Sequence, residues 1–280
     1  MELPNNLHDP YACHRMPREK KKKARADELL VMKGLASSRS EAKLLLMAGK
    51  VRTSSEVIDK AGRELPIDIE LTVIEPPRFV SRAGEKLEGM LEHLGIELDL
   101  DRALDIGAST GGFTDCLLQR GVKTVTCVDV GYNQLHHKIR SHPAVTNIER
   151  YNARNLKAAD LPHPDYPLIV TDVSFISLRH ILPPAWEVLK NGGMFICLVK
   201  PQFEADKKTM DQCRGIIRDV QLSESIAHGI RDFAVSSLSE CRLLDFQPSV
   251  IQGTDGNQEY LMALMKSNVS ASSESQIAES

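Results

Sequence analysis

A glycine-rich turn between an apolar run and a helical segment is the feature that most restricts the fold of this chain. Residues 103–106 are apolar apart from Asp105, and residues 107–113 then read G-A-S-T-G-G-F. Glycines let the backbone approach a ligand closely, and a helix that begins there offers unpaired N–H groups. About twenty residues later Asp129 ends a second apolar run, where its carboxylate can accept both hydroxyls of a ribose. The sequence therefore predicts an α/β domain with an adenosine site.

The rest of this domain alternates between short β-rich runs and helical segments. Such alternation is typical of a mostly parallel sheet that is covered on both faces, which predicts a Rossmann-like fold. We expect strands at 103–106, 124–130, 168–172, 194–199, 242–246 and 260–265, and helices over 82–95, 112–120, 178–190 and 220–237.

The composition of the turn favours S-adenosylmethionine as the ligand. The turn lacks the second glycine of G-x-G-x-x-G, and the carboxylate of Asp105 precedes it within the strand. A carboxylate there would repel a pyrophosphate but suits a cationic sulfonium or an amino-acid moiety. A nicotinamide-dependent oxidoreductase with the same architecture stays as the alternative enzyme. The expected cofactor contacts are Asp105, Gly107, Ala108, Ser109, Gly111, Gly112, Phe113, Asp129 and Val130.

Two charged residues end later strands of the same predicted sheet. Asp172 closes the run 168–172, and Lys200 follows the run 194–199. In an open α/β sheet, ligands bind outside the carboxyl ends of the strands. We therefore expect both side chains to face the crevice of the glycine-rich turn, with Asp172 also near the cofactor.

Basic charge is concentrated at the front of the chain. The net charge is −3, yet residues 1–60 contain thirteen Lys or Arg and eight Asp or Glu. This asymmetry indicates a polyanionic partner, because basic side chains gain affinity by releasing counterions from phosphates. Residues 1–24, which contain the run Lys20, Lys21, Lys22 and Lys23, are expected to form a flexible basic arm.

A small α+β domain is predicted over residues 25–75. Two short helices, separated by a break at Gly34 and with a Ser-rich start to the second, precede strands at 50–53 and 69–74. Prolines in the segment 75–78 interrupt all periodicity, so we place a linker at 76–81 and the larger domain at 82–266. The Ser-rich residues 267–280 are expected to be a disordered tail.

Cysteine spacing and hydropathy indicate a protein of the cytoplasm. The six cysteines form no C-x-x-C pair and have no histidine at metal-ligand spacing, so we expect buried thiols and no metal. The sequence has no run of about 18 apolar residues and no apolar signal core, so no membrane partner is expected.

The chain from about Ala26 to Lys266 resembles the TlyA family, and its larger domain resembles the FtsJ type of ribose 2′-O-methyltransferase. The first domain is similar to the RNA-binding fold of ribosomal protein S-four, through residues 34–39 and 49–51, although Thr53-Ser54-Ser55 replaces the more usual turn that contains Asn-Gly. The motifs that carry the resemblance of the larger domain lie at 79–87, 105–113, 128–135, 171–178, 199–204 and 256–260.

The resemblance implies 2′-O-methylation of cytidine in ribosomal RNA, on 23S rRNA and in some members also on 16S rRNA, with ribosomal RNA or ribosomal subunits as partners. It places the adenine of the cofactor near Asn152 and Ala153. Members are often called haemolysins, but this sequence has no sustained amphipathic helix that would form a pore. A ribosome-assembly protein that binds RNA without catalysis is the non-enzyme alternative. The family's catalytic tetrad falls on Lys86, Asp172, Lys200 and Glu259.

The chemistry of the tetrad follows from the weak acidity of a ribose hydroxyl, which must be deprotonated or strongly hydrogen-bonded as it attacks a methyl group. A lysine can assist if its ammonium is destabilised, and a second lysine nearby does this by repulsion. We expect Lys200 to steer or deprotonate the hydroxyl, Asp172 to orient Lys200, and the other two to complete the charge network. The expected RNA contacts are Lys20, Lys21, Lys22, Lys23, Arg25, Arg39, Lys43, Lys50 and Arg82.

Overall fold

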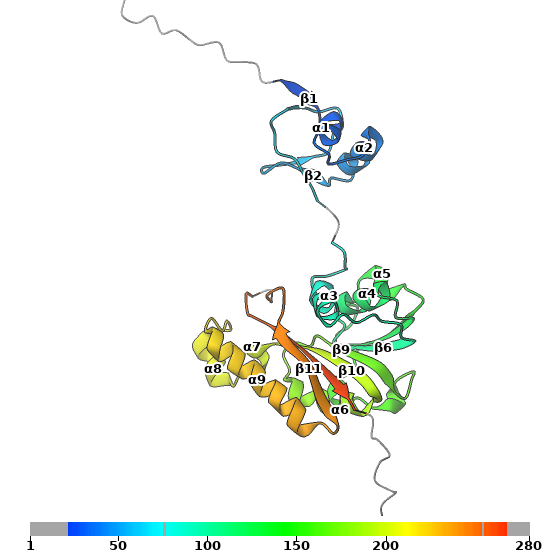
Figure 1. Cartoon of the computed structure of the whole chain (residues 1–280), viewed down its shortest axis with the longest axis vertical. Coiled ribbons are helices and arrows are strands. Elements are labelled where there is room, and N and C mark those ends of the chain that lie inside the picture. The colour runs from blue at the N-terminus through cyan, green and yellow to red at the C-terminus, as the bar shows by residue number, and fades with distance from the viewer. Residues whose placement is uncertain (1–21, 75–76, 254, 268–280) are drawn as a thin grey trace, which may run out of the picture. The chain divides into compact units, whose positions relative to one another are not determined.

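The computed structural model describes residues 22–74, 77–253 and 255–267 of the 280-residue chain. The chain divides into two compact units, residues 1–76 and 77–280, and the division falls within the proline segment 75–78 (Figure 1). Each unit has its own hydrophobic core.

The N-terminal unit packs two short helices on small antiparallel sheets. Helix α2 begins after Ser38, whose Oγ accepts a hydrogen bond from the Glu41 backbone N–H, as expected for an N-cap. The core contains the buried residues Leu29, Leu30 and Leu46. The helices are α1 (Ala26–Met32) and α2 (Arg39–Met47), and the strands are β1 (Lys23–Arg25) paired with β4 (Glu64–Pro66), and β2 (Val51–Arg52) between β3 (Val57–Ile58) and β5 (Thr72–Val73).

The structure differs from the predicted α+β domain in its strands. Lys23 and Ala24 belong to β1, so pairing begins inside the segment that was predicted to be a flexible arm. Strands β1, β3 and β4 were not predicted, because strands of two or three residues carry almost no periodicity. The turn after β2 is built by Thr53, whose Oγ1 accepts hydrogen bonds from the backbone N–H groups of Ser55 and Glu56. The side chain of Thr53 therefore stabilises the turn that the more usual sequence forms with Asn-Gly.

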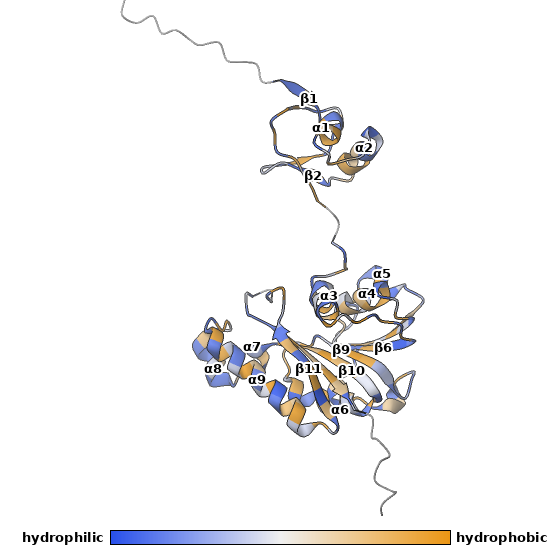
Figure 2. Cartoon of the chain, in the orientation of Figure 1, coloured by the Kyte–Doolittle hydropathy of each residue, from blue (hydrophilic) through white to orange (hydrophobic). Residues whose placement is uncertain are grey.

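The C-terminal unit contains one seven-stranded sheet in the order β11-β12-β10-β9-β6-β7-β8. All neighbours from β10 to β8 are parallel, and β12 runs antiparallel to both of its neighbours. The strands are coloured as largely hydrophobic in Figure 2, as is usual when both faces of a sheet are covered. Their bounds are β6 (Arg102–Ile106), β7 (Thr124–Val128), β8 (Val145–Ile148), β9 (Tyr166–Thr171), β10 (Leu189–Val199), β11 (Cys241–Pro248) and β12 (Tyr260–Lys266).

Helices cover both faces of this sheet. Buried side chains of α3 and α4, among them Leu87 and Leu117, form a core on one face, and those of α6 and α9, among them Trp186 and Ile230, form a core on the other (Figure 1). The doubly covered Rossmann-like architecture that was predicted is therefore confirmed. The helices are α3 (Ala83–Leu94), α4 (Gly112–Gln119), α5 (His137–Arg140), α6 (Leu182–Glu187), α7 (Pro201–Glu204), α8 (Lys207–Cys213) and α9 (Val220–Ser237), with 3-10 turns η1 (Ala153–Asn155), η2 (Ala158–Asp160) and η3 (Leu178–His180).

Three expectations about this unit were wrong in detail. Strand β8 was not predicted, because its four residues alternate only weakly. The helix predicted at 178–190 is divided into η3 and α6, and β10 already begins at Leu189. The strand predicted at 194–199 is β10, which already includes Gly192 and Gly193 at a point where its pairing register with β9 shifts.

The strand order places a ligand crevice at the carboxyl end of β6. This strand pairs with β7 on one side and with β9 on the other, which makes it the topological switch point of the sheet. The backbone N–H of Gly107 donates to the carbonyl of Val128 at 2.7 Å, and that of Asp172 donates to Ile106 at 3.2 Å. The glycine-rich turn is thereby bonded to the ends of both neighbouring strands.

Candidate active site

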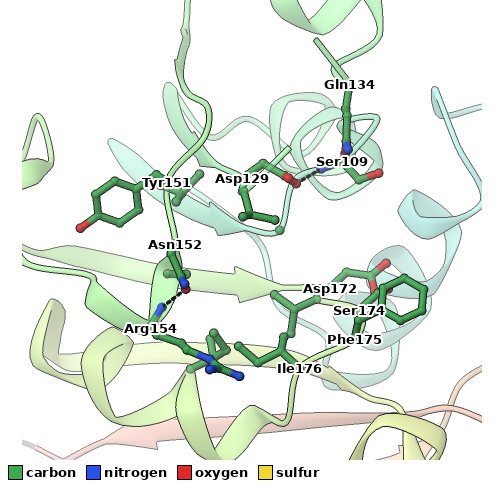
Figure 3. A pocket seen from close by; sticks show the side chains of 16 residues that line it. Ser109, Asp129, Gln134, Tyr151, Asn152, Arg154, Asp172, Ser174, Phe175 and Ile176 are labelled. Carbon is green, nitrogen blue, oxygen red and sulfur yellow. Dashed lines mark hydrogen bonds between the residues drawn. The ribbon is translucent and has the colours of Figure 1, made fainter. Parts of the chain in front are cut away.

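A cavity of about 530 Å³ opens at the carboxyl ends of β6, β7 and β9 (Figure 3). The predicted cofactor contacts that line it are Gly107, Ser109, Asp129, Val130, Asn152, Ala153 and Asp172. The cavity also has lining residues that were not predicted from the sequence, among them Gln134, Tyr151, Arg154, Ser174, Phe175 and Ile176. These lie in loops after the strands, where neither periodicity nor a turn motif indicates which side chains point inward.

Five predicted contacts do not line the cavity: Asp105, Ala108, Gly111, Gly112 and Phe113. They support the turn instead. Phe113 is buried in the core between the sheet and α3, and Asp105 is fully buried within β6. Asp105 lies within β6, and Gly112 and Phe113 begin α4, so strand and helix direct these three residues into the protein.

Gly107 shows why the turn needs glycine. Its φ is +78°, and a Cβ at this position would lie 2.8 Å from Cγ1 of Val173. Any larger residue would therefore push the loop after β9 away from the turn. The absence of a side chain lets the turn and the loop after β9 lie in contact beside the cavity.

Asp129 is held at the cavity by the backbone. Its Oδ2 accepts a hydrogen bond from the N–H of Ser109 at 2.8 Å (Figure 3), and its Oδ1 accepts one from the N–H of Gly131 at 2.7 Å. A carboxylate has about four acceptor positions, so each oxygen can still accept a hydroxyl. This arrangement suits the two hydroxyls of a ribose.

Asp105 lies beneath the turn in an unusual electrostatic position. Its Oδ2 accepts a hydrogen bond from Oγ1 of Thr114 at 2.6 Å, and its Oδ1 has no hydrogen-bond partner among the described residues. Burial raises the pKa of Asp105 to about 7, and the charges of Asp172 and Asp129 contribute in the same direction. A buried carboxyl with an unsatisfied oxygen fits a site that receives a cationic ligand.

The raised pKa of Asp105 predicts how stability depends on pH. The unfolded chain loses this proton near pH 4 and the folded protein near pH 7, so stability from this group falls as pH rises from about 4 to 7 and is then constant. This loss in the free energy of unfolding amounts to about 4 kcal/mol between pH 4 and 7. We expect it to be absent in Asp105→Asn, which keeps an acceptor for Thr114 but has no titrating group. Urea unfolding of both proteins from pH 4 to 8 measures this difference. Equal slopes would show that Asp105 titrates normally.

The four tetrad residues form two ion pairs. Nζ of Lys200 lies 2.6 Å from Oδ1 of Asp172 and donates to Oγ of Ser174 at 2.9 Å. Nζ of Lys86 is hydrogen-bonded to Oε2 of Glu259, and both side chains are more than nine-tenths buried. Each lysine therefore has its own carboxylate.

Strand register brings the two pairs to the same edge of the sheet. Val199, the last residue of β10, is paired with Tyr260, the first residue of β12. Lys200, which follows β10, and Glu259, which precedes β12, therefore lie at adjoining ends of two antiparallel strands. Asp172 follows β9, which pairs with β10 on its other side. Asp172, Lys200 and Glu259 thus come from three adjacent strands.

Helix α3 packs closely on α4, and this packing places Lys86 at the same edge of the sheet. A Cβ on Gly84 would lie 2.4 Å from the Phe79 ring, and one on Gly112 would lie 2.2 Å from Oγ of Ser81. Only glycine fits at both contacts, which explains the motif at 79–87 in physical terms. Lys86, in the first turn of α3, then reaches Glu259.

The predicted RNA contacts in the N-terminal unit have different environments. Arg25 and Arg39 both bond to the fully buried carboxylate of Asp27, and these bonds hold the pKa of Asp27 well below its usual range. Their guanidiniums are about half exposed and are held in fixed positions. Lys22, Lys23 and Lys43 are exposed, Lys50 is half-buried, and Lys20 and Lys21 lie outside the described residues. Arg82, the remaining predicted RNA contact, is an exposed residue of the C-terminal unit.

The cysteines and the metal and membrane expectations can be compared with the described part of the chain. Cys116, Cys127 and Cys197 are buried free thiols, whereas Cys213 and Cys241 are only half-buried. Within residues 22–74, 77–253 and 255–267, no cluster of three or more His, Cys, Asp or Glu side chains could hold a metal ion. No helix in these ranges has the length and hydrophobicity needed to cross a membrane.

Fold and site together define a methyltransferase of the Rossmann-like class. Sequence and structure comparisons agree with this class. The family model described as FtsJ-like methyltransferase matches residues 79–266. A protein of Bacillus subtilis (strain 168), YqxC, provisionally named an rRNA methyltransferase, is 43% identical over 244 residues, which cover 87% of this chain and 86% of that protein.

Two further relatives extend the match over both units. The 16S/23S rRNA (cytidine-2'-O)-methyltransferase TlyA of Mycobacterium tuberculosis (strain ATCC 25618 / H37Rv) is 37% identical over 249 residues, 87% of this chain and 90% of that protein. A solved structure from Streptococcus thermophilus, provisionally named a hemolysin, is 39% identical with a TM-score of 0.65 and covers 89% of this chain and 90% of that chain. The chain belongs to the FtsJ-like methyltransferase family. Its cofactor is S-adenosylmethionine, and the nicotinamide alternative has no support.

Proposed function

We propose that this protein methylates the ribose 2′-hydroxyl of a cytidine in ribosomal RNA. The observation that carries the proposal is the Lys200–Asp172 ion pair, because Asp172 also lines the cofactor cavity. The names of the relatives from Mycobacterium tuberculosis and Bacillus subtilis support ribosomal RNA as the substrate. When bound, S-adenosylmethionine supplies a methyl group on a positively charged sulfur that an oxygen nucleophile can take.

Lys200 keeps protons that it can donate to the substrate. An ammonium carries three protons: one is donated to Oγ of Ser174, whereas Asp172 contacts Nζ as an ion pair and its Oδ1 accepts no hydrogen bond from the described residues. A remaining proton of the ammonium can be donated to the 2′-oxygen, which holds the oxygen in place and stabilises the negative charge on it as the hydroxyl proton passes to bulk water. Because Asp172 and Ser174 fix the position of Nζ, little reorganisation is needed during the reaction.

Lys86 and Glu259 support this centre from the adjoining strand end. Their buried ion pair places two charges beside the Lys200–Asp172 pair without adding net charge. We propose that this second pair positions the ribose and the end of β12, and that it does not itself take up the proton.

The N-terminal unit supports RNA as the partner. Arg25 and Arg39 present guanidiniums from a fixed frame built on Asp27, and guanidiniums held in this way suit phosphate oxygens. We propose that this unit binds the ribosomal RNA that is methylated. The proposed substrates are 23S rRNA and also 16S rRNA. A ribosomal substrate also supports a location in the cytoplasm.

The test is to supply S-adenosylmethionine labelled in its methyl group to the purified protein together with isolated large or small ribosomal subunits. We expect each modified subunit to carry the label at the 2′-oxygen of one cytidine in its rRNA. Mass spectrometry of nuclease fragments maps the labelled nucleotide. Label on a base, or no label with either subunit, would contradict the proposal. Protein with Lys200→Ala serves as the inactive control.

A further inference from the structure

We propose that Glu204 is a positioning residue for methyl transfer: it clamps the loop after β9 to helix α7 and thereby sets the geometry of the Lys200–Asp172 pair. This inference rests on the function proposed above. It concerns a residue that does not line the cavity and belongs to neither ion pair of the tetrad.

Glu204 bonds directly to the far end of the loop that begins at Asp172. Its Oε2 accepts a hydrogen bond from Oγ of Ser177 at 2.5 Å, and its Oε1 accepts one from the N–H of Leu178 at 2.8 Å. Glu204 itself ends α7, the four-residue helix that follows Lys200. One carboxylate therefore joins the segment after β10 to the segment after β9.

The same two segments are joined a second time at the reaction centre. Lys200 contacts Asp172 and Ser174 at one end, and Glu204 contacts Ser177 and Leu178 at the other. Two links between two short segments restrict both their separation and their relative rotation. A single link at Lys200 would leave the loop free to pivot about the ion pair.

The loop between these links needs such support. Phe175 has φ of +62°, which is strained for a residue with a side chain, and it is 90% exposed. Its ring lies 4.9 Å from that of Phe203, which is also in α7. Val173 packs against Gly107, so the loop has little room on its inner side. A strained loop persists only where its surroundings hold it, and α7 supplies the outer support.

The chemistry of Glu204 agrees with a role as a clamp. Partial burial raises the pKa of Glu204, so the site is unfavourable for a charged carboxylate, and the two hydrogen bonds act in the opposite direction. The group is kept there as an acceptor for two donors. Glutamine can do the same work, because its amide oxygen can accept from Leu178 and its amide nitrogen can donate to Ser177.

The test compares Glu204→Ala and Glu204→Gln in the full-length protein with ribosomal subunits as substrate. We expect Glu204→Ala to lower kcat about 100-fold with little change in KM for the subunit, since misplacement by about 1 Å costs this much. Glu204→Gln should return most of the lost rate. An unchanged kcat in Glu204→Ala, or an equally inactive Glu204→Gln, would overturn the proposal.

Asp219→Ala is the matched control for a loss that is merely structural. Its carboxylate also accepts two backbone hydrogen bonds, from Gln221 and Leu222, but both lie within the first turn of α9 and neither joins the loop after β9 to α7. We expect a lower melting temperature with kcat unchanged.

If Glu204→Ala does not fold, Ser177→Ala provides a second test, because it removes one of the two bonds to Glu204. This variant should lower kcat about tenfold at wild-type KM. An unchanged kcat in Ser177→Ala overturns the proposal. Wild-type protein that methylates no subunit would refute the proposed function and not the clamp alone.

Discussion

Lys200→Ala lowers the rate of methyl transfer about 1000-fold and leaves the affinity for S-adenosylmethionine nearly unchanged; this is the largest effect on catalysis that we expect. The ammonium of Lys200 is held by its ion pair with Asp172 and its hydrogen bond to Ser174, and it has protons left for the substrate oxygen. Alanine removes this donor but does not alter the turn at Gly107 or the carboxylate of Asp129. The chemical step should therefore be lost while the cofactor cavity is kept.

Single-turnover rates with labelled S-adenosylmethionine measure the chemical step, and calorimetry measures cofactor affinity. Asp129→Ala is the matched control, because it removes an acceptor from the cavity and not from the reaction centre. We expect that variant to bind the cofactor at least about tenfold more weakly. Methylation by Lys200→Ala at a rate close to that of the wild type would remove Lys200 from the mechanism.

The largest expected effect on stability comes from Glu259→Ala. Glu259 and Lys86 are buried together, and alanine would leave the ammonium of Lys86 without its carboxylate in a site that water hardly reaches. Breaking a buried pair by removing one partner costs about 3–5 kcal/mol. Urea unfolding should show a free energy of unfolding lowered by that amount, with a lower midpoint and an unchanged slope.

The double variant Lys86→Met with Glu259→Leu separates charge from packing. Replacing both members of a buried ion pair by apolar side chains of similar volume is often neutral for stability. We expect the double variant to recover most of the stability that Glu259→Ala loses and yet to remain impaired in methyl transfer, because the charges beside Lys200 are gone. If the Glu259→Ala protein is as stable as the wild type, the ammonium of Lys86 does not need Glu259 as its partner, and the expectation is wrong.

Some features of the site could be read directly from residues 103–130. Glycine at position 107 is required by its positive φ and by contact with Val173, and such a glycine after an apolar strand is visible in the sequence. Asp129 directly follows β7 and lines the cavity, as expected for a residue at the carboxyl end of a parallel strand. The strands of the sheet, except β8, were recognised by their apolar runs, since both faces are covered.

Other features needed long-range contacts. The bond between Lys86 and Glu259 joins residues 173 positions apart, and no local pattern couples them; only the family motif suggested their role. The positions of Ser174 and Phe175 at the cavity, and the clamp of Glu204 on Ser177, depend on how two loops pack. Lys23 joined a strand because Pro66 supplies its partner from 43 positions away.

The sequence by itself determined the doubly covered sheet, the glycine turn and the carboxylates at the strand ends, because periodicity and backbone conformation are local properties. Only the tertiary structure decided that Asp105, Gly112 and Phe113 support the turn from beneath, and that Lys200 is held by Asp172 and Ser174 together. The physical reason is that the direction of a side chain in a loop, and the burial of its charge, are set by neighbours that are distant in the chain.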